Sequence, residues 1–375
     1  MNICIIGWYG TETLGDRAIL DGIIKSFGYK YQEIVFKIGS LYPFYTKRTL
    51  YEEKDTFLKS APLAEFEVFE IKNVRERREV IRSCDVVLMG GGPLMDLVEL
   101  YIIDDCFLYA KSKGIPTYIF GCGIGPLNNF EYINLVRRIL KNSYRVCIRD
   151  ELSIMYAKEI LGDNYKYELL GDPAIISIEN YKREHTEFSR DDYLVVNFRN
   201  YPQQDYGGCN YFDRDEQIEL LKMLLNHYSQ IKLVPMHTFF MGGDDREYLA
   251  KIDMMIRNEK IEVIHNPLNL EQLYFCFANA KACIGMRYHS VVMQTILNGN
   301  NFILNYTDPQ NGKIPGYIKE LGNPSFYNSR VINMQQKQPK DIIERICEKL
   351  CLDEHFDYMY SNTEKAYREF VISNI

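Results

Sequence analysis

Arg287 and His289 stand two residues apart at the end of a short apolar run, in the stretch IGMRYHSVVMQT. The run from Ala282 to Met286 is typical of a buried strand, and the residues after it have helical periodicity. A helix N-terminus favours anions, and an adjacent arginine offers a fork for phosphate or carboxylate. A histidine gives or takes a proton near neutral pH. The pair could hold and protonate an anionic substrate, although a surface arginine and a hydrogen-bonded core histidine would explain the same residues.

Similar side chains end other apolar runs. Arg199, His237 and Tyr306 do so in the second half of the chain, and Arg149 does so in the first half. Ligands of open α/β sheets bind beyond the carboxyl ends of the strands, where such residues would gather. Their recurrence favours an anion-binding, proton-carrying edge over a set of unrelated surface residues.

Glycines occupy the corresponding strand ends in the first half. The stretch GWYGTETLGDRAIL contains Gly10 and Gly15, and MGGGPLMD contains Gly91 and Gly92. The spacing fits neither a dinucleotide fingerprint nor a P-loop. These glycines either let a backbone approach a ligand or make tight turns, and Asp16 either accepts hydrogen bonds from hydroxyls or caps the following helix.

No metal or cofactor signature stands out. The triplet Asp213-Arg214-Asp215 resembles a metal-binding DxD, but it directly precedes the helical stretch EQIELLKMLL, where acidic residues stabilise a helix start without a metal. The sequence has no HExxH, zinc-type spacing or GxSxG. We therefore expect no metal site and no bound cofactor.

Composition excludes several classes of protein. The net charge of −7 argues against nucleic acid as a partner, and no segment has the roughly 20 apolar residues of a membrane span. The cysteines form no disulfide framework, and the N-terminus lacks a signal-peptide pattern. We expect a cytoplasmic protein, with the inner face of the membrane as a place of peripheral contact.

Short apolar runs alternate with helical stretches, which is typical of parallel α/β sheets. The pattern pauses at the polar stretch Glu179–Asp192, read as a linker, and then restarts. We predict two Rossmann-like domains facing a cleft, as in GT-B glycosyltransferases. The predicted parts are an N-terminal domain over 1–183, a C-terminal domain over 190–345, and a helical tail over 346–375 that crosses back to the first domain.

The chain resembles the polysaccharide pyruvyl transferase family over about residues 4–315. The resemblance is carried, in order, by GWYGTETLGDRAIL, DVVLMGGGPLMD, FGCGIGPL, IRDELS, VPMHTFFMGGDD and CIGMRYHSVVMQTILNGNNFILNYTDPQNGK. It implies a GT-B-like enzyme that transfers the enolpyruvyl group of phosphoenolpyruvate to a sugar, forming a pyruvate ketal and releasing phosphate. The expected acceptor is a saccharide, including lipid-linked precursors of capsule or exopolysaccharide.

The resemblance also implies roles for individual residues. His289 would protonate the donor, Arg287 would hold it, and His237 would be a second acid/base or phosphate-binding group. Donor binding is further expected from Arg149, Arg199 and Lys313. The acceptor sugar would face the first half, at Gly10, Gly15, Asp16, Gly91 and Gly92.

The sequence departs from the family pattern at three places. Thr13 replaces a usual asparagine, and Tyr288 replaces a frequent leucine within Arg-x-His. The stretch Asn298–Asn301 replaces Gly-x-Pro. The Arg–His pair is intact, so the departures bear on the acceptor more than on the chemistry. Two alternatives remain: a GT-B glycosyltransferase using a nucleotide sugar, and a protein that binds a glycan or partner without turnover.

Overall fold

The computed structural model describes residues 1–125, 127–162, 165–200, 212–350 and 354–375. Its contacts divide the chain into two compact units. The first unit consists of Met1–Glu12, Asp16–Ser177 and Ser361–Ile375, and the second of Thr13–Gly15 and Ile178–Tyr360. The sequence predicted that residues 178–183 belong to the N-terminal domain, but the structure places them in the second unit. Of the predicted tail over 346–375, only Ser361–Ile375 belongs to the first unit.

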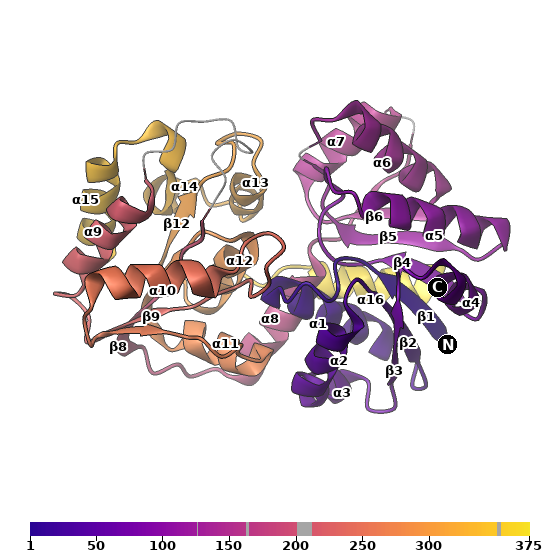
Figure 1. Cartoon of the computed structure of the whole chain (residues 1–375), viewed down its shortest axis with the longest axis horizontal. Coiled ribbons are helices and arrows are strands. Elements are labelled where there is room, and N and C mark those ends of the chain that lie inside the picture. Colours follow the sequence, from indigo (N-terminus) through magenta and orange to yellow (C-terminus); the bar gives the residue numbers. More distant parts are fainter. Residues whose placement is uncertain (126, 163–164, 201–211, 351–353) are drawn as a thin grey trace. The chain divides into compact units, whose positions relative to one another are not determined.

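The first unit contains a seven-stranded parallel sheet in the order β3-β2-β1-β4-β5-β6-β7 (Figure 1). Its strands are β1 (Asn2–Ile6), β2 (Val35–Ser40), β3 (Glu65–Glu70), β4 (Val86–Met89), β5 (Thr117–Cys122), β6 (Arg145–Ile148) and β7 (Glu168–Leu169). Its helices are α1 (Leu14–Gly28), α2 (Pro43–Glu52), α3 (Lys54–Ser60), α4 (Val74–Arg82), α5 (Leu100–Ser112), α6 (Phe130–Asn142), α7 (Glu151–Leu161) and α16 (Thr363–Asn374). Helix α8 (Pro173–Glu184) begins in this unit and ends in the second, and the first two residues of α1, Leu14 and Gly15, belong to the second unit.

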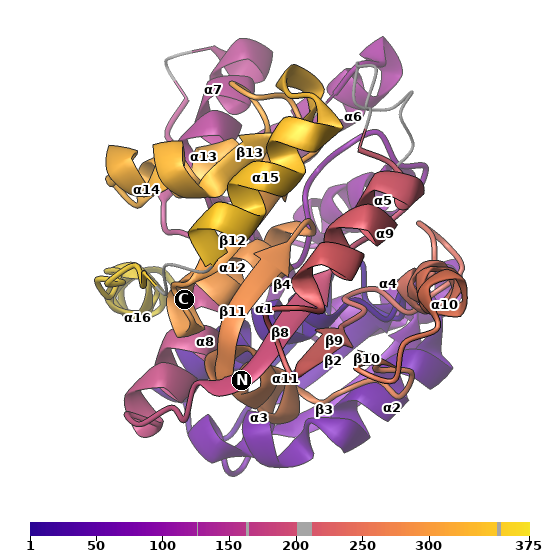
Figure 2. The ribbon, with the colours of Figure 1, turned by 90° about the vertical axis from the view of Figure 1, so that its left-hand side faces the viewer.

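The second unit contains a six-stranded parallel sheet in the order β10-β9-β8-β11-β12-β13 (Figure 2). Its strands are β8 (Asp191–Asn197), β9 (Gln230–Leu233), β10 (Ile261–Val263), β11 (Ala280–Gly285), β12 (Asn301–Asn305) and β13 (Val331–Asn333). Its helices are α9 (Arg214–Leu224), α10 (Asp245–Ile256), α11 (Leu270–Ala278), α12 (Tyr288–Leu297), α13 (Lys313–Glu320), α14 (Pro324–Arg330), the short η2 (Met334–Gln336) and α15 (Pro339–Leu350).

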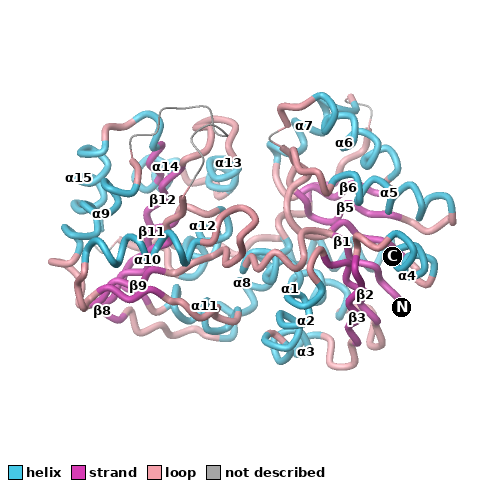
Figure 3. Tube along the Cα trace, viewed as in Figure 1, coloured by secondary structure: helices cyan, strands magenta, loops and turns pink. Residues whose placement is uncertain are grey.

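The central strands of both sheets are buried along almost their whole length. Figure 3 shows helices around the strands of each sheet. Such continuous apolar strands are expected where helices cover both faces of a parallel sheet. The predicted α/β class with two Rossmann-like domains and C-terminal helices is therefore confirmed.

The order of the strands indicates where each unit binds ligands. The connections reverse direction between β1 and β4 in the first sheet, and between β8 and β11 in the second. Ligands of such sheets bind beyond the carboxyl ends of the strands at this switch point. Arg199 follows β8 and Arg287 follows β11, so two predicted donor-binding residues lie at the switch point of the second sheet.

The predicted linker over Glu179–Asp192 was partly wrong, because helix α8 continues to Glu184 and β8 begins at Asp191. The C-terminal part of α8 is rich in polar residues, yet one face of the helix is buried. Ile178 and Tyr181 are buried, and the Tyr358 hydroxyl donates to the fully buried Glu179 carboxylate at 2.8 Å.

Within the described part of the chain, every helix is too short or too polar to cross a membrane.

Helix α16 gives a test of how the C-terminal segment stabilises the first unit. The buried Tyr367 ring packs against Phe120, with 4.9 Å between the ring centroids. Its hydroxyl donates to the Gly171 carbonyl at 2.9 Å. We expect Tyr367→Ala to cost about 3–5 kcal/mol of unfolding free energy through the cavity, and Tyr367→Phe about 1 kcal/mol through the lost hydrogen bond. Urea titration of Trp8 fluorescence measures both, since Trp8 is the single tryptophan and lies in this unit.

Ile372→Ala is the matched control, because Ile372 lies on the same helix and is 51% exposed. A Tyr367→Ala protein as stable as this control would contradict the packing of α16 described above.

Candidate active site

Arg287 is held by a buried carboxylate. It precedes helix α12, and its Nε and Nη2 donate to Asp245 Oδ2 and Oδ1 at 2.7 and 2.6 Å. The Asp245 side chain is 2% exposed and that of Arg287 is 16% exposed. This two-bond geometry fixes the guanidinium plane and leaves the Nη1 amino group outside the ion pair. Arg287 is thus presented in one orientation, with one amino group available to an anion.

The same carboxylate organises the segment that carries His237. Asp245 Oδ2 accepts hydrogen bonds from the amides of Met236 and His237, both at 3.1 Å. The Asp245 amide in turn donates to the His237 carbonyl at 2.9 Å. The loop between β9 and α10 is therefore closed on itself and tied to Arg287 through one side chain.

Asn197, at the end of β8, completes this arrangement. Its Oδ1 accepts from the Arg287 amide at 3.1 Å, and its Nδ2 donates to the Val234 carbonyl at 2.9 Å. Asn197 is fully buried, so both ends of its amide are used within the protein. The carboxyl ends of β8, β9 and β11 are thereby held in register at the switch point.

His237 has hydrogen bonds at both ring nitrogens. Nε2 lies 2.5 Å from the Met241 carbonyl, and Nδ1 lies 2.8 Å from the Thr13 hydroxyl. A carbonyl only accepts, so Nε2 carries the proton and Thr13 donates to Nδ1. Burial lowers the pKa of His237, and the charge of Arg287 lowers it further. The ring is thus a neutral, fixed imidazole, better suited to shaping the site than to transferring protons.

His289 lies in the first turn of α12 and is partly exposed. Its ring packs over Gly15, where an added Cβ would lie only 2.0 Å from Nδ1. The ring of Tyr288 stands edge-on to the His289 ring, with 5.0 Å between the ring centroids. It also stands edge-on to the ring of Tyr317, with 6.1 Å between the centroids. Gly15 therefore gives room to the predicted acid, and the departure at Tyr288 is part of the packing that holds it.

Arg199 and Lys313 act on a buried phenol. The Arg199 Nη1 donates to the Tyr306 hydroxyl at 3.0 Å, and the guanidinium carbon lies 5.2 Å from the ring centroid. Burial by itself would raise the pKa of Tyr306, but the charges of Arg199, Lys313 and Arg287 outweigh it and lower the pKa to about 8. The cations of this edge thus act on one side chain, and they come from the ends of β8 and β11 and the start of α13.

Arg149 has a different environment in the first unit. Its Nε donates to Asp150 at 2.9 Å, and its Nη1 lies 3.5 Å from Asp172. All three side chains are at least 93% buried. Two carboxylates therefore balance this guanidinium inside the unit, which makes Arg149 a weaker donor ligand than the cations of the second unit.

The glycine-rich strand ends of the first unit are filled by their own neighbours. Gly92 has φ +69°, and an added Cβ would overlap the ring of Trp8, whose Nε1 donates to Pro93 O at 3.1 Å. Gly91 has φ +125°, and the adjacent Tyr9 hydroxyl donates to Gly90 O. Internal packing is thus sufficient to require Gly91 and Gly92.

The two other acceptor candidates of this unit are also enclosed. A Cβ on Gly10 would lie 2.6 Å from the Ser40 hydroxyl. Asp16 is 9% exposed, and its charge adds to the burial that raises the pKa of Tyr9. The structure gives each of these residues a local role and leaves acceptor contact a prediction.

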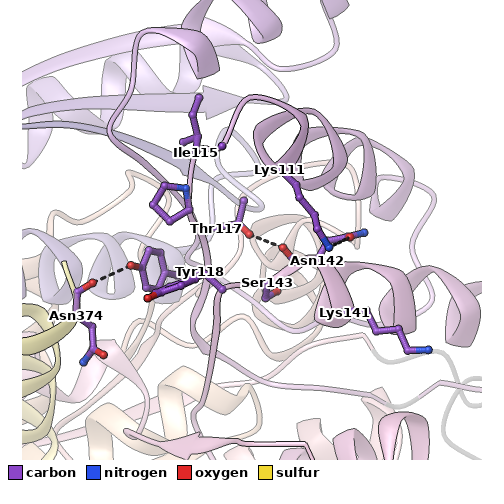
Figure 4. A pocket seen from close by; sticks show the side chains of 11 residues that line it. Lys111, Ile115, Thr117, Tyr118, Lys141, Asn142, Ser143 and Asn374 are labelled. Atoms are coloured by element: carbon purple, nitrogen blue, oxygen red, sulfur yellow. Dashed lines mark hydrogen bonds between the residues drawn. The ribbon is translucent and has the colours of Figure 1, made fainter.

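A surface pocket of about 550 Å³ lies at the opposite edge of the first sheet (Figure 4). It is lined around the starts of β5 and β6, where Tyr118 donates to the Asn374 carbonyl at 2.9 Å and Lys111 donates to Asn142 Oδ1 at 3.0 Å. None of the site residues expected from the sequence lines it. A site at the amino ends of the strands also conflicts with the ligand geometry of such sheets, so we follow the chemistry of the carboxyl ends.

The acidic triplet is a helix cap. Asp213 precedes α9, its side chain accepts from the Asp215 amide at 2.9 Å, and Glu216 accepts from the Asp213 amide at 3.0 Å. Across the described ranges, no cluster of three or more His, Cys, Asp or Glu side chains could hold a metal ion. The structure therefore gives the triplet the role of a capping box.

Sequence reasoning missed or underused four residues of this site. Asp245 reads as an ordinary acidic residue at a helix start, and Asn197 as the end of an apolar strand. Thr13 was noted only as a departure from the family pattern, and Tyr306 only as a strand end. The signal that could have found them is their position, since each lies at or next to the carboxyl end of a strand or the start of a helix.

The sequence matches the family model for polysaccharide pyruvyl transferase over residues 14–308. No curated protein sequence matches the chain at a significant level.

Similar solved structures share the fold at low identity. A putative UDP-N-acetylglucosamine 2-epimerase from Listeria monocytogenes has a TM-score of 0.61 at 12% identity, covering 99% of this chain and 94% of its own. The UDP-GlcNAc 2-epimerase from Methanocaldococcus jannaschii in complex with UDP-GlcNAc and UDP has a TM-score of 0.60 at 15% identity, covering 99% of both chains. The E. coli ADP-heptose lps heptosyltransferase II has a TM-score of 0.51 at 13% identity, covering 94% of this chain and 99% of its own.

The Asp245–Arg287 pair makes the first prediction for this site. Asp245→Asn removes the charge that balances Arg287 and one acceptor of the two-bond pair. We expect Asp245→Asn to lower the free energy of unfolding by about 3 kcal/mol. This is the low end of the range for breaking a buried ion pair, because Arg287 is partly exposed. Hydrogen–deuterium exchange of the α10 and α12 peptides would rise accordingly. Glu247→Gln is the control, an exposed carboxylate in the first turn of the same helix; equal exchange in the two variants would contradict the role of Asp245.

Gly15→Ala gives a second prediction, with opposite signs for two effects. Alanine is a better helix former than glycine, and Gly15 is the second residue of α1, so an unhindered change should be neutral or stabilising. The contact with His289 predicts instead a lower melting temperature and a shifted His289 imidazole resonance in NMR spectra. A stabilised protein with an unmoved His289 signal would refute that contact.

Proposed function

Because the family match covers most of the chain, the chain belongs to the polysaccharide pyruvyl transferase family, and we propose that it uses phosphoenolpyruvate as donor. Membership makes it a transferase. In the proposed reaction, the three carbons of the donor become a cyclic pyruvate ketal on two hydroxyls of a sugar, and phosphate is released.

One observation carries the choice of donor. Arg199, Arg287 and Lys313 are all partly exposed, and their charges converge on Tyr306 at the end of β12. Phosphoenolpyruvate has a phosphate and a carboxylate. The guanidinium group of arginine and the ammonium group of lysine are the side-chain groups that bind such anions. The Nη1 of Arg287, outside its pair with Asp245, supports a contact with the carboxylate or the phosphate.

The chemistry requires one acid and two deprotonations. His289 donates a proton to C3 of the donor while the first sugar hydroxyl attacks C2, and it then receives the proton of that hydroxyl. The C–O bond to phosphate breaks, the second hydroxyl attacks C2, and its proton leaves with the phosphate as the monohydrogen dianion. The methyl group of the ketal thus gains the proton that His289 carried, the first hydroxyl returns a proton to His289, and the reaction uses no oxidant or reductant.

Other predicted residues receive narrower roles in this proposal. His237, with both nitrogens engaged, shapes the site beside Arg287 instead of transferring protons. Arg149, paired with two carboxylates, supports the structure of the first unit. Gly10, Asp16, Gly91 and Gly92 remain our candidates for acceptor contact, and a lipid-linked saccharide would bring the enzyme to a membrane surface.

The donor assignment is tested by phosphate release from phosphoenolpyruvate in the presence of methyl glycosides with neighbouring or 4,6-related hydroxyls. We expect His289→Gln to lower kcat by about 10²–10⁴-fold, the usual contribution of a positioned acid–base group. Arg287→Lys keeps a charge but loses the fork, so the KM for phosphoenolpyruvate should rise. His265→Gln, an exposed histidine of the same unit, serves as control; unchanged kinetics in the two site variants would sink these roles.

A nucleotide-sugar glycosyltransferase is the second candidate. It is favoured by the fold shared with the UDP-GlcNAc epimerases and the heptosyltransferase. A ligand that binds the folded state raises the melting temperature, so the two donors can be compared directly. Stabilisation by phosphoenolpyruvate without an effect of UDP or GDP supports our proposal, and the reverse result supports the glycosyltransferase.

A further inference from the structure

Two adjacent phenylalanines in the loop between β9 and α10 have opposite surroundings. Phe239 is 3% exposed, whereas Phe240 is 72% exposed. The two rings are tilted against each other, with 4.4 Å between their centroids. Phe239 therefore anchors the loop in the second unit, and Phe240 packs on it with most of its surface accessible to solvent.

Hydrogen bonds and backbone conformation fix the position of Phe240 within this loop. The His237 Nε2 donates to the Met241 carbonyl at 2.5 Å, and the Gly243 amide donates to the Phe240 carbonyl at 3.4 Å. Gly242 and Gly243 have φ of +84° and +85°, a conformation that side chains with a Cβ rarely adopt. The segment that presents the exposed ring is thus a closed, hydrogen-bonded turn.

The same loop contacts the arginine predicted to bind the donor. The Gly243 carbonyl accepts from Arg287 Nη2 at 3.4 Å, and Asp245, just after the loop, pairs with the same guanidinium. Two successive hydrogen bonds through Gly243 therefore connect the Phe240 carbonyl with the guanidinium of Arg287. A substrate that reacts with an anion held by Arg287 must bind in the neighbourhood of this loop.

An ion pair in the same segment adds hydrogen-bonding groups. The side chains of Arg246 and Asp244 are 34% and 22% exposed, and Arg246 Nη2 donates to Asp244 Oδ2 at 2.6 Å. Arg246 Nη2 also donates to the Thr238 carbonyl at 3.0 Å, which ties the pair to the loop two residues before Phe240. A carboxylate accepts from hydroxyl groups and a guanidinium donates to them.

The combination of an exposed ring with these polar groups matches the two kinds of surface of a sugar. The faces of a sugar ring consist of C–H groups, and its rim carries hydroxyls. The face of a phenyl ring is the negative part of its quadrupole and attracts C–H groups, while a few well-placed polar groups orient a ligand. Single exposed phenylalanines are ordinary on protein surfaces. One that is fixed on a closed turn beside a candidate active site indicates a binding surface.

We infer that the ring of Phe240 is the surface on which a sugar ring of the acceptor stacks, with the Asp244–Arg246 pair beside it. A saccharide acceptor follows from the family match, and its reaction with an anion at Arg287 rests on the proposed function. Phe240 binds the acceptor and takes no part in proton transfer. It adds a residue of the second unit to the acceptor candidates of the first.

Steady-state kinetics with phosphoenolpyruvate and methyl glycosides separate the two substrates. We expect Phe240→Ala to raise the KM for the glycoside about 10-fold through the lost stacking, and to leave the KM for phosphoenolpyruvate unchanged. Phe240→Tyr keeps the ring and should retain the KM for the glycoside. Phe240→Leu keeps an apolar side chain without a ring and should behave like Phe240→Ala. Phe275→Ala is the matched control, because Phe275 is 57% exposed on α11 of the same unit.

A second measurement needs no donor. Phe240→Trp puts a fluorescent ring at the proposed surface, and its emission should shift and saturate as a methyl glycoside is added to the full-length chain. The signal of Trp8, measured in the unmodified chain, is subtracted, since Trp8 is the single natural tryptophan. Phe275→Trp is the control for this titration, and its emission should not respond.

The outcomes separate this inference from the proposed function. A saturable emission change in Phe240→Trp without phosphate release from phosphoenolpyruvate would reject the donor and retain the role of Phe240. Phosphate release with the same KM for the glycoside in Phe240→Ala and the unmodified chain would overturn the inference and retain the donor. A rise in the KM for phosphoenolpyruvate alone, a Phe240→Leu protein that binds glycosides normally, or a Phe240→Trp emission that never responds would overturn it as well.

Discussion

The arrangement of the second unit depends on one buried carboxylate. Asp245 accepts four hydrogen bonds, two from Arg287 and one each from the amides of Met236 and His237. Burying a carboxylate is unfavourable unless its oxygens are paired and hydrogen-bonded, and here both are. Because these bonds exist without any ligand, the cost of orienting Arg287 is met by folding and not by substrate binding. This is the preorganisation that electrostatic stabilisation of a charged transition state requires.

The two units show opposite states of the same feature, an arginine after a strand. In the first unit, Arg149 is enclosed by Asp150 and Asp172, so its charge is balanced locally. In the second unit, Arg287 is paired with a single carboxylate, that of Asp245, and remains partly exposed. A strand-end arginine in the sequence therefore does not by itself identify an anion site. The number of buried acids that share its surroundings decides whether its charge remains available.

The alternation of apolar runs and helical stretches was enough to predict the fold class, because buried parallel strands have a strong sequence pattern. The linker was mispredicted because the polar letters of α8 conceal buried Ile178 and Tyr181, an amphipathic face that needs its tertiary partner to be recognised. At the site, Arg287 and His289 were found from local spacing, and the structure puts them at the switch point of the sheet. Asp245 was assigned no role and Tyr306 no partner, since they contact side chains 42 and 107 residues away.

The three departures from the family pattern now have physical explanations within the second unit. Thr13 donates to His237 Nδ1, a bond that an asparagine amide could also supply, so the change preserves the donor. Tyr288 packs between His289 and Tyr317. In the third stretch, Asn298 donates to the carbonyls of Phe277 and Ala280 at 2.9 and 2.7 Å, which ties the end of α12 to β11. Each departure contacts His237, His289 or the elements β11 and α12 that flank Arg287, and none of them adds or removes a charge. The electrostatic features used to infer an anionic donor are therefore independent of the positions at which this chain differs from its family.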